Sequence, residues 1–292
     1  MIPPAMPDLS YDAIETGQTY GPYKYPLKDR IARHLEAVEN MHPWHHERSP
    51  WGPPVAPPAI LGNAALRFID SIAPVPPGTL HARQQIETIS ALRRDRKLIG
   101  YGQFLEKYER RGRRWFVFEA RFRDETGLMI GNSRVTMTFP QKEQGTGNRE
   151  QGAAAPPTAE LTPVTRALTQ EKMTAYSEDS ANALRGQSIH VQPQAAGAAG
   201  FGATVAQGLM SADYVSEMMT ELLGKEWFAY AGLSLTFVRP VLCGDTLTAG
   251  GRLAEAIREG AVERRVYDVW CANQRGEAVT VGKASSLVMP GR

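Results

Sequence analysis

One histidine is the residue in the second half of the chain best suited to proton chemistry. His190, in "GQSIHVQP", is the only histidine after His81, and five of the six histidines lie in the first 81 residues. An imidazole can take up or release a proton near neutral pH. No second histidine and no cysteine cluster lies nearby in the sequence, which argues against a metal centre. His190 is therefore either a structural residue or a general base.

A polar stretch separates the part of the chain that contains His190 from the part before it. Residues 141–160, "QKEQGTGNREQGAAAPPTAE", are rich in Gly, Ala and Pro and nearly lack large apolar residues. This composition is typical of a linker. The sequence thus predicts an N-terminal domain at 1–140 and a C-terminal domain at 161–292, each of ordinary domain size.

The two predicted domains share one layout. Each begins with a short helical pattern, passes through a His-containing loop into a longer apolar helix, and ends in four strand patterns. We expect helices at 27–40, 58–72, 168–182 and 207–224, and strands at 84–92, 98–109, 114–124, 129–139, 231–241, 245–257, 262–273 and 278–289. The turns "DETG" and "NQRG" place Gly127 and Gly276 149 residues apart. The pattern predicts a duplicated α+β unit, a helix buried against an antiparallel sheet.

This layout resembles the double hotdog fold, and the second half resembles the MaoC-like dehydratases, the family of the (R)-specific enoyl-CoA hydratases. The resemblance is carried by "SIHVQPQAAGAAGFGATVAQGLMSADYVSEMM", "LSLTFVRPVLCGDTLT" and "VWCANQRGEAVTVGKA". The first half is similar to the N-terminal domain of such duplicated proteins at "SPWGPPVAPPAIL". The resemblance implies two tandem hotdog domains, each an antiparallel sheet wrapped around a central helix.

The family's chemistry is the syn addition of water across a 2-enoyl-CoA thioester, or the reverse. The resemblance implies an Asp-x-Asn-Pro-x-His motif that activates water, and a glycine N–H that polarises the thioester carbonyl. Hydration builds negative charge on the thioester oxygen, which a donor at a helix N-terminus stabilises. A histidine paired with a carboxylate can move the protons. CoA enters as part of the substrate, and neither a metal nor another cofactor is implied.

The resemblance assigns roles to residues around the second long helix. His190 matches the catalytic histidine, and Gly208, eighteen residues later, matches the glycine. Gln207, Ser216 and Arg239 are candidates for substrate binding, and Arg239, which precedes a Gly-Asp turn, is otherwise a structural residue.

The acidic position departs from the family pattern. Counting from the helix start places Asn182 there, with three more residues before His190 than the family has. "SED" offers Asp179 instead, with a longer loop still. An amide can hold a water but cannot accept a proton. Both residues stay candidates, and an asparagine at this position would favour another reaction, such as isomerisation, retro-aldol cleavage or thioester hydrolysis, or acyl-CoA binding alone.

The first half carries a weaker version of the same motif. In "ENMHPWHH", Asn40, Pro43 and His45 match the motif positions. "VAPP" replaces "VAQG", however, so Pro58 stands where Gly208 stands in the second half. Proline has no N–H, so the carbonyl-polarising donor is missing. We predict a degenerate site in the first half, which completes the sheet and shapes the acyl pocket.

Composition excludes other classes of function. A net charge of +2 argues against nucleic acid as a partner. The basic runs "RRDRK" and "ERRGRR" are interpreted as solvated strand ends and a turn, with contact to an anionic ligand as the alternative. Two isolated cysteines, no secretory signal and no long apolar run predict a cytoplasmic protein away from the membrane. A homodimer is possible.

Overall fold

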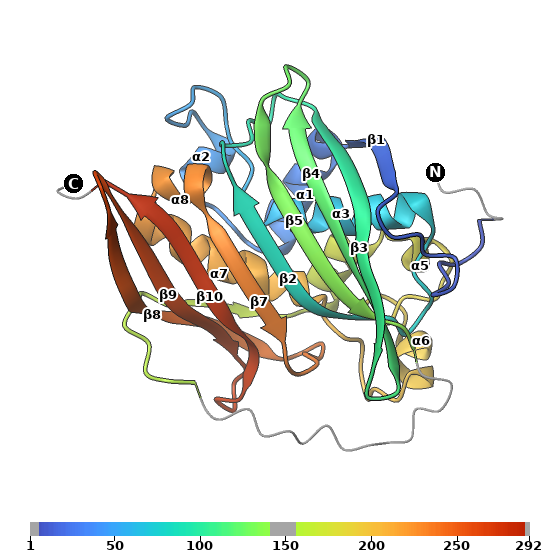
Figure 1. The fold of residues 1–292 in the computed structure, drawn as a ribbon. Coiled ribbons are helices and arrows are strands. Elements are labelled where there is room, and N and C mark those ends of the chain that lie inside the picture. Colours follow the sequence, from blue (N-terminus) through green and yellow to red (C-terminus); the bar gives the residue numbers. More distant parts are fainter. Residues whose placement is uncertain (1–5, 141–155, 290–292) are drawn as a thin grey trace.

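The computed structural model describes residues 6–140 and 156–289. Ten strands form one antiparallel sheet, and α3 and α7 lie against one of its faces (Figure 1). The strands are β1 (Thr19–Tyr25), β2 (Leu80–Thr88), β3 (Leu98–Arg110), β4 (Arg113–Asp124), β5 (Met129–Thr138), β6 (Val164–Ala167), β7 (Gly232–Phe237), β8 (Thr246–Glu259), β9 (Val262–Ala272) and β10 (Ala278–Val288). The helices are α1 (Leu27–Ala37), α2 (Pro43–His46), α3 (Ile60–Ile72), α4 (Gln170–Ser177), α5 (Ala181–Leu184), α6 (Pro193–Ala198), α7 (Gly208–Leu223) and α8 (Lys225–Tyr230).

The order of the strands is symmetric about the middle of the sheet. The order is β1-β3-β4-β5-β2-β7-β10-β9-β8-β6, so each half of the chain contributes five adjacent strands in the same relative order. The halves meet where β2 pairs antiparallel with β7, with Ile86 opposite Leu233. Figure 1 shows β2 and β7 side by side in the centre of the sheet. The fold therefore carries the internal repeat that the sequence pattern predicts.

The repeat extends to the hydrogen bonds of single turns. Asp124 Oδ1 accepts hydrogen bonds from the backbone N–H groups of Thr126 and Leu128 between β4 and β5. Asn273 Oδ1 accepts the corresponding bonds between β9 and β10. Gly127 and Gly276 adopt φ values of 89° and 74° in these turns, a conformation that glycine reaches without the steric cost of a side chain. The prediction that these glycines occupy matching places is confirmed.

The two long helices are central to a core that the halves share. One buried apolar cluster includes residues of α3, such as Phe68, and residues of α7, such as Met210 and Val215. Helix α7 is buried around most of its circumference, as its apolar pattern predicts. A buried polar network also joins the halves: His34 Nε2 lies 3.1 Å from Asp213 Oδ1, and the Tyr176 hydroxyl donates to Asp213 Oδ2 at 2.6 Å. This network fixes α4, the helix that precedes the His190 loop.

The eight predicted strands and the helices predicted at 27–40, 58–72 and 207–224 are present, with shifted ends. The single helix predicted at 168–182 is wrong, because the chain is interrupted between Ser177 and Ala181 and forms α4 and α5 instead. Two further strands, β1 and β6, were not expected because "TYGPYKY" contains an internal Gly-Pro and "VTRA" has only four residues. Both lie at the edges of the sheet, where only one side needs a partner. Thr169 caps α4 by accepting a hydrogen bond from Lys172 N–H. In the described ranges, no helix is long and apolar enough to cross a membrane.

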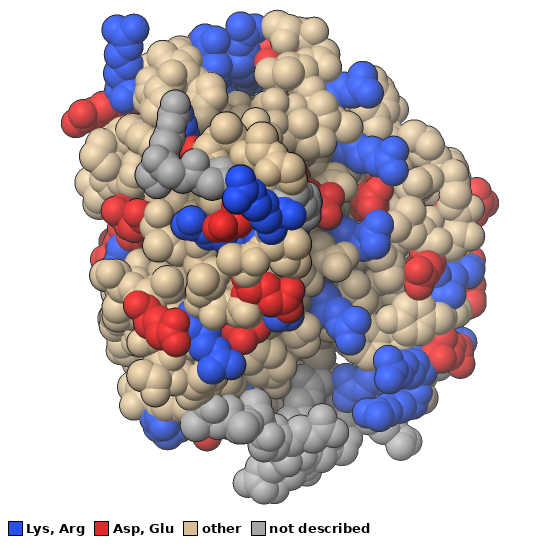
Figure 2. Space-filling view, turned by 60° about the vertical axis from the view of Figure 1, so that its left-hand side comes forward, with Lys and Arg blue, Asp and Glu red and all other residues tan. Residues whose placement is uncertain are grey.

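The surface in Figure 2 mixes both signs of charge. Lys, Arg, Asp and Glu side chains are scattered among uncharged residues on this face, and several Lys and Arg side chains gather at its lower right. This distribution matches the small net charge of the chain.

Candidate active site

A cavity of about 700 Å³ lies between residues from both halves of the chain. The second half contributes the His190 loop, the start of α7 and the end of β7. The first half contributes the C-terminal part of α3, the start of β2 and the β3–β4 hairpin. The walls are largely apolar, and His190, Asn182 and Gly208 are among the polar groups in them. A cavity of this size and lining is typical of a small-molecule site.

Three hydrogen bonds hold His190 in the cavity wall. Its N–H donates to Ser188 Oγ at 3.1 Å, and its carbonyl accepts from Gln170 Nε2 at 3.1 Å. The ring Nδ1 lies 2.6 Å from the carbonyl oxygen of Val205. Val205 is itself bridged to Leu242. Both the backbone and the ring of His190 are therefore fixed before any ligand binds.

The bond to Val205 determines the tautomer of His190. A carbonyl oxygen only accepts, so Nδ1 must carry the proton, and Nε2 keeps a lone pair. Burial lowers the pKa of His190 to about 4; the hydrogen bond to Val205 opposes this shift, and the charge of Arg67 adds to it. The imidazole is thus neutral at neutral pH and able to take a proton at Nε2.

Gly208 begins α7 at the cavity wall. As the first helical residue, it has no carbonyl one turn earlier within the helix to accept from its N–H. A Cβ at this position would lie 2.8 Å from the ring of Phe237, so only glycine fits this close contact. Ser211 Oγ donates to the Gly208 carbonyl at 2.6 Å and fixes the first turn. The helix N-terminus can stabilise negative charge on a ligand oxygen.

Asn182 lies in the same cavity wall as His190. Its Nδ2 donates to the carbonyl of Val75 at 3.2 Å. Its Oδ1 is buried and has no hydrogen-bond partner in the described part of the chain. A buried acceptor left unpaired costs free energy, roughly 1–3 kcal/mol. This oxygen therefore has an unused capacity to accept a hydrogen bond.

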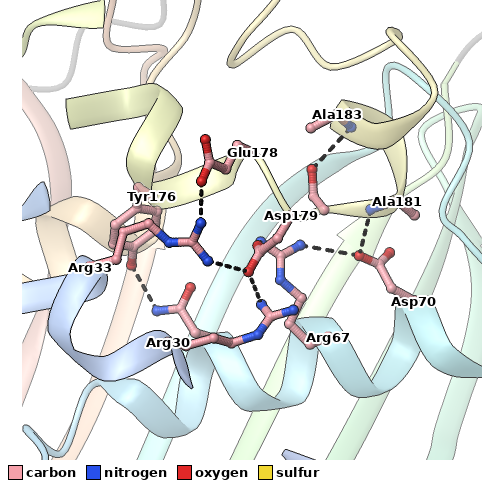
Figure 3. Close-up of polar contacts among 11 residues, drawn as sticks. Arg30, Arg33, Arg67, Asp70, Tyr176, Glu178, Asp179, Ala181 and Ala183 are labelled. Carbon is pink, nitrogen blue, oxygen red and sulfur yellow. Dashed lines mark hydrogen bonds and ion pairs between the residues drawn. The ribbon is translucent and has the colours of Figure 1, made fainter. Parts of the chain in front are cut away.

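Asp179 does not line the cavity, which corrects its assignment as the carboxylate that acts with His190. Its Oδ2 is bound by Arg30 at 2.6 Å, and its Oδ1 accepts from Arg67 Nη2 at 2.7 Å. Arg33 also contacts it (Figure 3). Both oxygens are thus occupied by arginines from the first half. The loop between α4 and α5 turns Asp179 toward α1 and α3, so its part is to join the halves.

Ser216 also lies outside the cavity, which corrects its assignment to substrate binding. It is buried in α7, and its Oγ accepts from Trp227 Nε1 at 3.0 Å. Gln207 and Arg239 do line the cavity. Gln207 Oε1 is buried without a partner among the described residues, whereas Arg239 forms an ion pair with Glu277 at 3.0 Å.

Several cavity residues were not predicted from the sequence. They are Asp70 near the end of α3, His81 in β2, and the arginines Arg83, Arg110 and Arg113. Arg110 and Arg113 belong to "ERRGRR", for which contact with an anionic ligand was the alternative interpretation. In the described part of the chain, no carboxylate forms a salt bridge with these three arginines. The basic run was the available signal, whereas nothing in the sequence marked Asp70.

The matching region of the first half is filled with aromatic side chains. His45 Nδ1 lies 2.8 Å from the carbonyl of Val55, the same bond that His190 makes to Val205. His45 is fully buried, and Phe228, Trp44 and Trp51 pack around it and Val55. Burial lowers the pKa of His45 to about 3. The histidine geometry is kept here, but no open space remains beside the ring.

The histidines of this region each have a partner of their own. His42 Nδ1 accepts from Trp44 N–H, and His46 Nε2 bonds to the carbonyl of Asn40. Within the described ranges, no group of three or more His, Cys, Asp or Glu side chains could hold a metal ion.

Comparisons with known proteins agree with this architecture. Residues 153–268 match the family model described as a MaoC like domain. A solved structure named MaoC-like dehydratase has a TM-score of 0.74 and 14% identity, over 96% of this chain and 99% of that one. A conserved hypothetical protein from Mycobacterium tuberculosis, described as a double hotdog fold, has a TM-score of 0.63 and 11% identity, over 96% and 99%.

A larger protein contains the same fold. The full-length peroxisomal multifunctional enzyme type 2 from Drosophila melanogaster has a TM-score of 0.66 and 17% identity, over 93% of this chain but 48% of that one. No curated protein matches the sequence significantly. The fold is thus of the hotdog type, and this chain contains a MaoC-like dehydratase domain in its second half.

Proposed function

We propose that this chain is a hydratase/dehydratase that adds water to a 2-enoyl-CoA thioester or removes it from the 3-hydroxyacyl-CoA. The observation that carries the proposal is that His190, with its Nδ1 against the carbonyl of Val205, lies in one largely apolar cavity with the N-terminus of α7. The MaoC-like family match supports the reaction class.

His190 supplies the base for this reaction. With Nδ1 bound to Val205, Nε2 takes a proton from water while the oxygen adds to the β-carbon. The unpaired Oδ1 of Asn182 can accept a hydrogen bond from the same water and orient it. The amide cannot take the proton, so Asn182 is a positioning residue in this scheme.

Gly208 supplies the electrostatic stabilisation. Charge develops on the thioester oxygen as water adds, and the N–H at the start of α7 is the donor for it. Phe237, packed against Gly208, keeps this region of the cavity apolar. In such surroundings, a fixed donor stabilises charge more than it would in water.

The arginines of the first half fit the anionic carrier of the thioester. Arg83, Arg110 and Arg113 line the cavity from β2 and from the end of the β3–β4 hairpin, and Tyr108 and Trp115 stack on that hairpin at 6.1 Å. Guanidinium groups bind phosphates through charge-assisted hydrogen bonds, and aromatic rings stack with a nucleobase. We infer two hotdog units, at 1–140 and 161–292, of which the first shapes the pocket and the second holds the catalytic groups.

The direct test is hydration by the purified full chain. A series of 2-enoyl-CoA thioesters of different chain lengths is followed by loss of the conjugated enoyl absorbance and by mass analysis of the product. The proposal expects a 3-hydroxyacyl-CoA, one water heavier, for some chain lengths. Saturating protein that produces no hydrated product from any of them would contradict it.

A second reaction on the same fold is the alternative that Asn182 favours. With an amide where the family has a carboxylate, the site could isomerise an acyl-CoA thioester, cleave it in a retro-aldol reaction or hydrolyse it. It could also bind acyl-CoA without turnover. The same mixtures separate these cases. Release of free thiol indicates hydrolysis, a shifted double bond indicates isomerisation, and tight binding with unchanged ligand indicates a binding protein.

A further inference from the structure

Asp70 places a carboxylate from the first half of the chain in the wall of the cavity. It lies near the C-terminal end of α3, and it is the only Asp or Glu among the described residues that line the cavity. Its side chain is 12% exposed. Among the described residues of the cavity wall, Asp70 is therefore the one carboxyl group that could take part in acid–base chemistry. It comes from the first half of the chain and not from the MaoC-like second half.

Asp70 is only lightly neutralised by its neighbours. Its Oδ2 accepts from Arg67 Nη1 at 3.3 Å and from Ala181 N–H at 3.4 Å, both long contacts (Figure 3). Arg67 makes a shorter bond, 2.7 Å, to Asp179. Burial raises the pKa of Asp70, although Arg67 and the backbone groups of Ala181 and Val75 oppose the shift. The neutral carboxylic acid is thus favoured more than at an ordinary aspartate.

Asp70 and His190 line the same cavity. The charge of Arg67 acts on the pKa of His190, and the same guanidinium contacts Asp70. Asp70 also binds the backbone N–H of Ala181, the residue before Asn182, whose side chain lines the cavity. The contact with Ala181 thereby joins Asp70 to the segment that contains Asn182, and Asp70, Asn182 and His190 line the same cavity.

We propose that Asp70 is the catalytic acid that exchanges a proton with the α-carbon, while His190 exchanges a proton with water. This inference rests on the proposed hydratase function. It gives the first half a catalytic group as well as a pocket wall, and it supplies the proton-transferring carboxyl that Asn182 lacks.

The protons and electrons of this division balance. In hydration, His190 Nε2 takes a proton from water as the oxygen bonds to the β-carbon, and the electrons of the double bond move toward the thioester carbonyl. Asp70 then gives its proton to the α-carbon as the electrons return. The product has gained one H and one OH, and the proton on His190 passes through solvent to the Asp70 carboxylate. Dehydration runs through the same steps in reverse.

The test compares two neutralised carboxylates that share Arg67. Asp70→Asn keeps an acceptor for Arg67 and Ala181 but cannot transfer a proton, whereas Asp179→Asn neutralises a carboxylate outside the cavity. General acid–base groups contribute roughly 10²–10⁴-fold to rate. Asp70→Asn is therefore expected to lose at least about 100-fold in kcat with KM within about threefold, while Asp179→Asn keeps kcat within about threefold.

The pH profile distinguishes a catalytic acid from a structural residue. Hydration needs a neutral His190 and a protonated Asp70, so the plot of kcat against pH is bell-shaped. Its acid limb lies near the lowered pKa of His190, about 4, and its alkaline limb at the raised pKa of Asp70. Among groups that face Asp70, Arg67 stays charged, and burial raises the pKa of Tyr23. The residual activity of Asp70→Asn should lack the alkaline limb. Circular dichroism at each pH shows whether the protein stays folded.

Each outcome decides the inference. The expected losses and the missing limb support it. Wild-type hydration with Asp70→Asn above about one third of wild-type kcat overturns it and leaves the proposed function intact. If Asp70→Asn does not fold, the pH profile of wild-type kcat decides instead. A profile without an alkaline limb, measured where the wild-type protein stays folded, overturns the inference. A wild-type chain that hydrates no 2-enoyl-CoA overturns the proposed function first.

Discussion

The ring Nδ1 of His190 lies 2.6 Å from the carbonyl oxygen of Val205. This one bond fixes which nitrogen carries the proton and which faces a reacting water. The first half repeats it between His45 and Val55, at 2.8 Å. The two halves thus keep the same histidine geometry, but only the second keeps an open cavity beside it.

Gly208→Ala should impair both stability and catalysis. Alanine normally stabilises a helix by roughly 0.5–1 kcal/mol relative to glycine, but here its Cβ would meet the Phe237 ring at 2.8 Å. We expect a lower melting temperature and a kcat reduced by roughly 10–100-fold, because the first turn of α7 must move away from the ligand oxygen.

Gly197→Ala is the matched control for this change. Gly197 lies in α6, and no atom outside its neighbourhood lies within 4 Å of an added Cβ. It should leave stability and kcat unchanged or slightly improved. Equal behaviour of the two variants would contradict the role given to the Gly208 contact.

The arginines at the β3–β4 hairpin should bind the carrier and not the acyl group. The double variant Arg110→Ser/Arg113→Ser should raise KM for the CoA thioester roughly tenfold or more, and each factor of ten corresponds to about 1.4 kcal/mol of binding free energy. Its KM should also depend less on salt concentration than that of wild type. A thioester of N-acetylcysteamine, which lacks the nucleotide, should react equally with wild type and variant. Arg114→Ser is the control, because Arg114 is paired with Glu109 and does not line the cavity.

Buried histidine should make the folded chain less stable as the pH falls. His45 is fully buried, and burial lowers its pKa to about 3 against an ordinary value of 6.5. The unfolded state therefore binds the proton between these two values, so stability is lost as pH drops below about 6.5.

His45→Asn isolates this effect, because an amide can keep a donor for Val55 without titrating. Between pH 7.5 and pH 5, the variant should lose about 2 kcal/mol less unfolding free energy than wild type. Denaturant unfolding at both pH values measures this difference. Identical losses in the two proteins would show that His45 does not carry the effect.

Asp179 should matter for stability. Asp179→Asn leaves Arg30 and Arg67 with a neutral partner at a largely buried ion cluster, so we expect a loss of about 1–3 kcal/mol in unfolding free energy. Asp95→Asn removes the exposed pair with Arg93 and should cost below about 1 kcal/mol. Losses of equal size would contradict the joining role of Asp179.

The helices, the inner strands and the turn glycines could be predicted from the sequence because each depends on local periodicity or on a single backbone conformation. The edge strand β6 could not, because four residues carry too little pattern. At the site, His190 and Gly208 were predicted through a family motif. Asp70 was not, since its meeting with Ala181 joins residues 111 apart and depends on how α3 packs against the other half. The same packing removes Asp179 from the cavity.

His190, and not its counterpart His45, is the histidine that acts in catalysis, and the same substitution at both positions tests this assignment most directly. The measurement is kcat for 2-enoyl-CoA hydration in His190→Asn and in His45→Asn. We expect a loss of roughly 10²–10⁴-fold for His190→Asn and near wild-type kcat for His45→Asn at neutral pH. Equal effects, or hydration that survives in His190→Asn, would contradict it.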